Sequence, residues 1–244
     1  MKSFANWLAY QLGYRIVPRW RIPRLPAAER LQAIFSKLQI DKVIDVGANE
    51  GQFYEFLRLE VGFTGQIVSF EPIPELAAQL RERSANDPSW TVHACALGAA
   101  AGERMLNVTQ KTGFSSFYQP LARGPRFCGN VVDRTIRVPV STLDELFSDP
   151  TSLRHTYLKL DTQGFDLEVA KGGSVTLATI PALQTEVSFV ALYDGMPDFQ
   201  KSLSTFGQYG FHVSDFFVVA ARPDGIACEF DCIMLRAMTS VEAD

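Results

Sequence analysis

Short apolar runs alternate along the chain with segments whose apolar residues recur at helical spacing. The runs KVIDVG (42–47), QIVSFEP (66–72) and TYLKLD (156–161) are typical of strands buried in a parallel sheet. Between them, apolar residues of 28–39 recur every three or four positions, and 74–84 begins with a proline, which the first turn of a helix tolerates. This alternation predicts βαβ units, and therefore an α/β fold with helices on both faces of a mostly parallel sheet.

The remaining elements follow the same two patterns. The last two apolar runs, 211–220 and 228–237, flank the turn sequence RPDG, so they predict an antiparallel pair at one edge of the sheet. The other predicted strands and helices are, in chain order, 52–60, 90–98, 165–173, 181–189 and 198–210.

One long segment departs from this alternation. Residues 103–110 and 134–141 read as strands, but 111–130 between them is rich in Gly, Pro, Ser and aromatic residues. A segment of this length is too long for a simple connection in a compact domain, so we predict a lid or substrate loop. Its aromatic faces with neighbouring hydroxyls would suit a sugar or polyol, and the candidate acceptor contacts are Phe114, Ser115, Ser116 and Tyr118.

The first 26 residues differ from the rest, and we treat them as an N-terminal arm ahead of one domain, 27–244. The arm contains only basic charges, interleaved with Trp and Tyr, and the first acidic residue is Glu29. We favour an arm whose aromatic residues cover the core. The alternative is a basic and aromatic surface for a membrane or a lipid-linked substrate. The basic residues are Lys2, Arg15, Arg19, Arg21 and Arg24.

Composition narrows the classes of function. The 244 residues are 47% hydrophobic with a net charge of −4, which suits a globular protein and disfavours a nucleic-acid-binding protein. No apolar run reaches the roughly 20 residues that span a bilayer, and the N-terminus lacks a signal-peptide pattern. The four cysteines form no CxxC pair, so we expect no zinc site and a reducing, cytoplasmic compartment.

A glycine-containing turn follows the first buried strand. In VIDVGANEGQF (43–53) the strand delivers Asp45, and the chain then turns through Gly47 and Gly51 into a helix. Glycines let a backbone approach a ligand closely, and a helix start offers unpaired N–H groups. The turn lacks the third glycine of the dinucleotide-binding fingerprint and the lysine of a P-loop, so alone it is a weak signal.

An acidic residue at the end of the next strand strengthens that signal. Glu71 follows the strand of QIVSFEP, and Pro72 fixes the turn after it. A carboxylate in this place can accept two hydrogen bonds from a ribose diol. Together, the glycine turn and Glu71 favour a ligand that contains adenosine.

Two further acids lie at the carboxyl ends of later strands. These are Asp161 and Glu186, and α/β sheets bind ligands at this edge. The pair could serve as a general base, or it could hold Mg²⁺, which prefers oxygen ligands and keeps several waters. We interpret Asp166, which follows Asp161, as a helix cap.

Five motifs occur in an order and spacing that resemble the FkbM family of S-adenosylmethionine-dependent O-methyltransferases. They extend over 41–189 and are VIDVGANEGQFYEFL, VSFEPIPELAAQL, VPVSTLDEL, LKLDTQGFDLEVAKGG and TEVSF. The chain departs from the family at Gln163, where an acid is common, and at Asp166, where Glu is frequent. The resemblance implies a seven-stranded Rossmann-like sheet and methylation of a hydroxyl, often on a sugar, glycan or polyketide-type natural product.

The resemblance also implies roles for individual residues. Glu71 would hold the ribose of S-adenosylmethionine, while Asp161 and Glu186 resemble ligands of metal-dependent O-methyltransferases, which would add Mg²⁺ as a cofactor. The remaining implied cofactor contacts are Asp45, Gly47, Asn49 and Gly51 at the methionine and ribose end, and Ala94, Cys95 and Ala96 near the adenine. Two alternatives remain open: a dehydrogenase-like nucleotide-binding module, and a methyltransferase fold without activity that serves in interactions.

Overall fold

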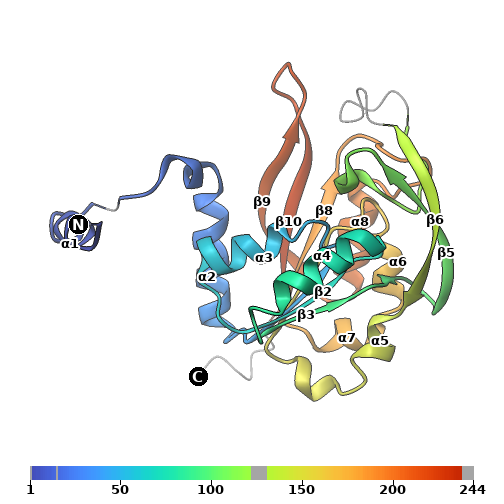
Figure 1. Cartoon of the computed structure of the whole chain (residues 1–244), viewed down its shortest axis with the longest axis horizontal. Coiled ribbons are helices and arrows are strands. Elements are labelled where there is room, and N and C mark those ends of the chain that lie inside the picture. Colours follow the sequence, from blue (N-terminus) through green and yellow to red (C-terminus); the bar gives the residue numbers. More distant parts are fainter. Residues whose placement is uncertain (1, 15, 122–130, 238–244) are drawn as a thin grey trace.

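The computed structural model of this chain describes residues 2–14, 16–121 and 131–237 (Figure 1). In this part of the chain seven strands form one sheet in the order β3-β2-β1-β7-β8-β10-β9. Strand β10 runs opposite to the other six strands, which all run in one direction, and this confirms the predicted α/β fold and its mostly parallel, seven-stranded sheet. The strands are β1 (Lys42–Val46), β2 (Gln66–Phe70), β3 (Trp90–His93), β7 (Thr156–Leu160), β8 (Ala182–Ser188), β9 (Phe211–Ala221) and β10 (Ala227–Arg236).

Helices cover both faces of this sheet because successive strand residues point to opposite sides. On one face, Leu31 and Phe35 of α2 pack in one core cluster with Val43 and Tyr157. On the other face, Ile44 belongs to a second cluster with residues of α6, α7 and α8. The helices are α2 (Leu25–Lys37), α3 (Gln52–Phe56) with a π-helical continuation η2 (Leu57–Val61), α4 (Pro74–Ser84), α5 (Leu143–Leu146), α6 (Asp166–Lys171), α7 (Ser174–Thr179) and α8 (Phe199–Gln208), with a 3₁₀ turn η4 (Pro150–Leu153) before β7.

A smaller three-stranded sheet corrects one sequence prediction. We expected 90–98 to be one strand, but the chain leaves the main sheet after His93 and forms β4 (Ala96–Leu97) in a second sheet. There β4 pairs with the distant β6 (Val132–Ser141), which also pairs with β5 (Gly102–Thr109). The break occurs because Ala96 and Leu97 align with the end of β6 and not with β2. Helix α7 was also not expected.

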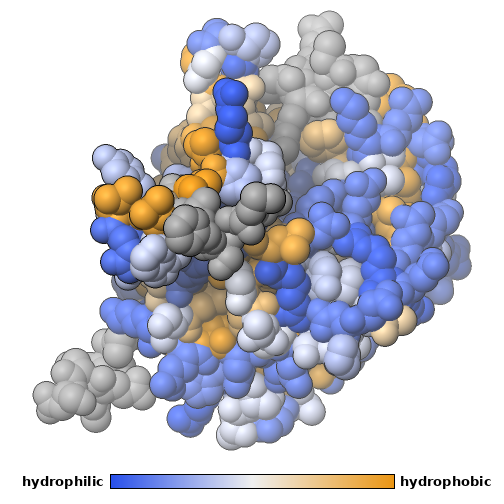
Figure 2. Space-filling model, turned by 60° about the vertical axis from the view of Figure 1, so that its left-hand side comes forward, coloured by the Kyte–Doolittle hydropathy of each residue, from blue (hydrophilic) through white to orange (hydrophobic). Residues whose placement is uncertain are grey.

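The N-terminal arm consists of α1 (Lys2–Gln11) and a 3₁₀ turn η1 (Arg19–Arg24), and it reaches away from the sheet (Figure 1). Our favoured interpretation, in which its aromatic residues cover the core, is wrong. Tyr10 is 79% exposed and Trp20 is 64% exposed. Figure 2, in which this side comes forward, shows hydrophobic residues gathered near the arm. None of the described helices is both long and apolar enough to cross a membrane.

The predicted lid lies partly outside the described residues, which exclude 122–130. Its described part contains a short 3₁₀ turn, η3 (Thr112–Phe114), followed by Ser116, which bridges to Asn107 of β5. We call residues 111–121 the lid segment.

Candidate active site

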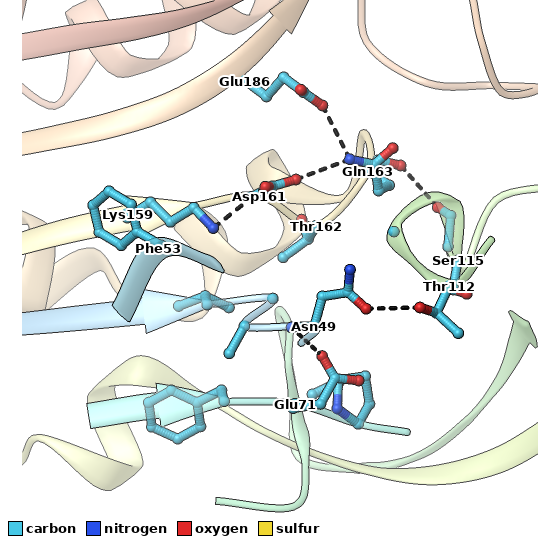
Figure 3. Close-up of a pocket in the computed structure, with 18 of the residues that line it drawn as sticks. Asn49, Phe53, Glu71, Thr112, Ser115, Lys159, Asp161, Thr162, Gln163 and Glu186 are labelled. Atoms are coloured by element: carbon cyan, nitrogen blue, oxygen red, sulfur yellow. Dashed lines mark hydrogen bonds and ion pairs between the residues drawn. The ribbon is translucent and has the colours of Figure 1, made fainter. Parts of the chain in front are cut away.

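A pocket of about 420 Å³ opens at the carboxyl ends of the parallel strands. Its walls come from the turn after β1, the turn after β2, the ends of β7 and β8, strand β10 and the lid segment (Figure 3). Parallel strands end at the same edge, so side chains far apart in sequence converge there, and this is where α/β sheets bind ligands.

The turn after β1 has a backbone that only glycine can supply. Gly47 has φ +85°, and a Cβ atom built there would lie 2.0 Å from the carbonyl oxygen of Asp161. Its N–H and that of Ala48 both donate to the carbonyl of Phe70, which ties β1 to β2. Gly51 and Asn49 also have positive φ, so alternate residues of the turn lie in the left-handed region.

Glu71 sits at the end of β2, buried beside this turn. Its two carboxylate oxygens accept hydrogen bonds from the backbone N–H groups of Asn49, at 2.7 Å, and Ile73, at 2.8 Å. Burial raises the pKa of Glu71 to about 7, although these two hydrogen bonds oppose the rise. The carboxylate is therefore fixed at the pocket wall, where its remaining lone pairs can accept hydrogen bonds from a ligand.

A buried lysine that the sequence analysis missed joins two of the predicted acids. The Lys159 ammonium lies 3.2 Å from an oxygen of Asp45 and 3.3 Å from one of Asp161. Burial on its own lowers the pKa of Lys159, but the carboxylates of Asp45, Asp161 and Asp231 outweigh burial and raise it. Lys159 is therefore a charged cross-link between β1 and the end of β7.

Lys159 could have been found from strand periodicity. It precedes Asp161 by two positions, so both side chains point to the same face, and it aligns with Asp45 of β1 and Gln184 of β8. The apolar character of the run TYLKLD concealed this polar row. Other pocket residues that the sequence analysis missed include Gln52, Phe53, Gln184 and Asp231, whereas Thr112 and Phe117 belong to the predicted substrate loop.

The structure brings Asp161 and Glu186 together, and we call them the acid pair. They do not face each other directly, because the side-chain amide of Gln163 lies between them. Its nitrogen is 2.9 Å from an Asp161 oxygen and 3.1 Å from a Glu186 oxygen (Figure 3). A nitrogen that donates to both carboxylates occupies the space where a shared cation would stand, so this arrangement does not fit the expected Mg²⁺. No group of three or more His, Cys, Asp or Glu suited to a metal occurs among the described residues.

Asp166 lies behind the acid pair and takes a structural part. It is buried and accepts hydrogen bonds from the backbone and hydroxyl of Thr162 and from the hydroxyl of Thr185, at 2.6 Å. Burial raises its pKa, and these hydrogen bonds oppose the rise. Asp166 thus holds the turn after β7 against β8.

Two hydrogen bonds connect the described part of the lid segment to the pocket. The hydroxyl of Thr112 donates to the side-chain oxygen of Asn49 at 2.9 Å, and the hydroxyl of Ser116 donates to the backbone oxygen of Gln163 at 2.8 Å. The lid segment therefore contacts both the glycine turn and Gln163, the residue that lies between the acid pair.

The residues predicted from the sequence fall into two groups by position. Those that line the pocket are Gly47, Asn49, Glu71, Ala96, Ser115, Ser116, Asp161 and Glu186. Those that lie outside its lining are Asp45, Gly51, Ala94, Cys95, Phe114 and Tyr118. Asp45 acts from behind through Lys159, while Tyr118 packs on the ring of Phe165.

Comparison with known proteins identifies the family of this chain. The model of the methyltransferase FkbM domain matches residues 45–213, a range that contains the glycine turn, Glu71 and the acid pair. A sequence search among curated proteins finds no match to the chain.

Among solved structures, a methyltransferase FkbM shares the fold. A methyltransferase FkbM from Methylobacillus flagellatus aligns with a TM-score of 0.51 and 16% identity over 80% of this chain and 43% of its own, so this chain spans less than half of that protein. A magnesium protoporphyrin IX methyltransferase from Synechocystis, solved with bound S-adenosylmethionine, aligns with a TM-score of 0.48 and 11% identity over 96% and 91% of the two chains. A 1,6-didemethyltoxoflavin N1-methyltransferase from Burkholderia thailandensis, solved with bound S-adenosylhomocysteine, reaches 0.43 at 11% identity, over 90% and 81%.

The family model extends over more than half of the chain, and the first of these structures shares its fold. The chain belongs to the FkbM family of methyltransferases.

Proposed function

We propose that this protein transfers a methyl group from S-adenosylmethionine to a hydroxyl of a sugar, a glycan, or a glycosylated or polyketide-type natural product. The observation that carries the proposal is the position of Glu71. Glu71 lies beside the glycine turn at one end of the pocket. The acid pair lines the other end of the same pocket.

The cofactor end of the pocket supports this proposal through shape and charge. Gly47 lets the turn after β1 pass close to the carbonyl of Asp161 at the pocket wall, and Glu71 offers acceptor oxygens for two ribose hydroxyls. The apolar side chains of Ile73, Leu97 and Phe117 line the pocket near Ala96, where an adenine ring could pack. When bound, S-adenosylmethionine supplies a methyl group on a sulfonium, which is a good leaving group.

The acid pair supports a role in handling the acceptor proton. An alcohol is a weak nucleophile, and a carboxylate within hydrogen-bond reach can accept its proton as the new O–CH₃ bond forms, a contribution of about 10²–10⁴-fold. Alignment of the hydroxyl with the methyl group can contribute about 7–11 kcal/mol more. We assign both tasks to the wall formed by Asp161, Glu186 and the hydroxyls of Ser115 and Ser116, with Phe114 and Tyr118 shaping the lid segment from outside the pocket.

The acceptor side of the proposal concerns a small molecule or glycan and not a nucleic acid. The net charge of −4 and the acids in the pocket disfavour a polyphosphate backbone. The exposed, basic and aromatic arm supports contact with a membrane surface or a lipid-linked acceptor. The unpaired state of Cys95, Cys228 and Cys232 agrees with the cytoplasmic location that we propose.

The proposal is tested first on the cofactor. Calorimetric titration with S-adenosylmethionine and with NAD separates methyl transfer from a dehydrogenase-like module, and we expect heat with the former alone. Cell extract incubated with the protein and methyl-labelled S-adenosylmethionine then identifies the acceptor. Label on protein or nucleic acid, with none on a glycan or small molecule, would contradict the proposed acceptor. Cofactor binding without transfer to any fraction would favour an inactive interaction protein.

A further inference from the structure

The acid pair is linked by a neutral side chain. One amide nitrogen of Gln163 lies within hydrogen-bond distance of Asp161 and of Glu186, and an amide nitrogen carries two hydrogens. Each carboxylate can therefore accept one N–H. The two hydrogen bonds together fix the separation between the two carboxylates.

The other end of the same amide is also held. The Gln163 amide oxygen lies 2.8 Å from the hydroxyl of Tyr193, a fully buried side chain that also reaches the carbonyl of Phe114 at 3.0 Å. Gln163 has φ +54°, and its own carbonyl accepts from Ser116. Both the backbone and the side chain of Gln163 are thus held in place. The backbone has a conformation that non-glycine residues seldom adopt.

The orientation of the amide follows from its neighbours. With the amide reversed, its oxygen would face two carboxylate oxygens at hydrogen-bond distance, an arrangement that is repulsive unless a cation or proton stands between them. The hydroxyl of Tyr193 can donate its one hydrogen to the amide oxygen in the orientation observed, and the more distant Phe114 carbonyl competes for that hydrogen. The site can therefore hold either a cation surrounded by three oxygens or an amide nitrogen between two carboxylates, but not both.

Charged groups on neighbouring elements also face the acid pair and Gln163. Lys159 of β7 faces Asp161 and also Asp45 of β1. Asp231 of β10 aligns with Glu186 in the sheet, and Asp166 of α6 lies close enough for the charge of Asp161 to raise its pKa. The positive charge of Lys159 thus reaches Asp161 from one side, while Gln163 supplies neutral donors from the other.

We propose that Gln163 is a positioning residue that takes the place of a divalent cation between Asp161 and Glu186, with Tyr193 orienting its amide. The inference rests on the proposed function: it means that methyl transfer at this site proceeds without a bound metal. The acid pair then accepts the proton of the acceptor hydroxyl, and the side chain of Gln163 in place of a metal ion keeps its two carboxylates in position.

Direct metal binding tests the proposal without any acceptor. Gln163→Glu keeps the length of the side chain and replaces the amide by a third carboxylate, so MnCl₂ or MgCl₂ titrated by calorimetry should bind at least tenfold more tightly to this variant than to the unchanged protein. Gln66→Glu, at the exposed amino end of β2, adds the same charge away from the pocket and should bind as the unchanged protein does. Unchanged protein that binds Mn²⁺ as tightly as Gln163→Glu would overturn the proposal, and so would equally weak binding by all three.

Turnover provides an independent readout with the acceptor found by methyl labelling. EDTA should leave the rate of the unchanged protein intact, whereas a rate lost to EDTA and restored by Mg²⁺ would overturn the proposal. Tyr193→Phe should lower kcat about tenfold with little change in KM for S-adenosylmethionine, because the amide loses its orienting hydroxyl. The control Tyr209→Phe removes a hydroxyl bonded to the Ala170 carbonyl outside the pocket and should leave kcat unchanged; equal kcat for both variants would count against Tyr193.

Failure of this inference and failure of the proposed function give different results. Loss of S-adenosylmethionine binding by the unchanged protein would remove the proposed function, while the metal titration would still report on Gln163. Normal cofactor binding together with tight Mn²⁺ binding by the unchanged protein would remove only the inference.

Discussion

At the scale of single residues, Glu71 makes cofactor affinity depend on pH. A ribose diol donates hydrogen bonds, so the ionised carboxylate is the form that binds it. With a pKa of about 7, Glu71 is mostly protonated at pH 6 and mostly ionised at pH 8. Because apparent affinity scales with the competent fraction, we expect binding of S-adenosylmethionine to tighten about tenfold between pH 6 and 8, measured by calorimetry.

The same group sets the sign of a stability change. The pKa of Glu71 is raised in the folded protein, so the folded state holds the proton more tightly and stability falls as pH rises from about 4.5 to about 7. Glu71→Gln should flatten both this slope and the pH dependence of binding, while Glu71→Ala should weaken binding at least tenfold. An affinity that depends on pH equally in Glu71→Gln would show that another group titrates.

Lys159 offers a second prediction at this scale, because it compensates a fully buried carboxylate. Lys159→Met keeps the side chain's bulk but leaves Asp45 charged and buried, so we expect a loss of about 3–5 kcal/mol in the free energy of unfolding. Urea unfolding measures the loss. Adding Asp45→Asn to Lys159→Met removes the buried carboxylate that has lost its partner, so the double variant should recover part of the lost free energy of unfolding. A double variant no more stable than Lys159→Met would contradict this account.

At the scale of elements, the turn after β1 depends on its contact with the end of β7. Gly47→Ala would place a Cβ 2.0 Å from the carbonyl oxygen of Asp161, so the turn must move, and we expect S-adenosylmethionine binding to be lost. Gly62→Ala is a matched control, since Gly62 has φ +75° but no atom within 4 Å of its Cβ position. The control should cost only the roughly 1–2 kcal/mol of a left-handed residue and leave binding unchanged. Equal effects of both variants would assign the loss to backbone strain alone.

The elements also show what the sequence could and could not predict. Strands β1 and β7 were predictable because both faces are buried, and the meeting of Asp161 with Glu186 followed from adjacent parallel strands. The break after His93 was not, because it depends on the pairing of Ala96 with β6, which lies far along the chain. The role of Gln163 as a bridge between the two acids could not be predicted from the sequence either. It depends on a left-handed backbone and on Tyr193, which comes from another segment.

At the scale of the whole molecule, two exposed apolar segments meet at the mouth of the pocket. Arg24, at the end of the arm, and Val219, in the hairpin of β9 and β10, both line the pocket. The hairpin exposes Phe216 and Val218, and the arm exposes Trp20 and Ile22. Apolar surface beside the pocket suits an acceptor with an apolar part, and the basic residues of the arm suit an anionic one.

Truncation of the arm tests this arrangement, and the structure indicates where to cut. Arg21 and Arg24 both contact the carboxylate of Glu60, whose side chain is only 4% exposed, and Arg24 also lies over the ring of Phe56. Removal of residues 1–26 would therefore leave Glu60 buried without these two partners and should lower the unfolding temperature. Removal of 1–17 keeps both arginines and deletes α1.

We expect the shorter truncation to retain the unfolding temperature and the affinity for S-adenosylmethionine, because the pocket lining begins at Arg24. Turnover of the acceptor should fall at least tenfold, since the exposed aromatic residues of α1 and its linker would no longer contact the acceptor or the surface that carries it. Sedimentation with vesicles of anionic and of neutral lipid separates these two sources of the loss: binding of the full chain to anionic vesicles alone, absent after truncation, assigns the arm to a membrane surface. Full turnover by the chain lacking 1–17 would remove the arm from acceptor recognition altogether.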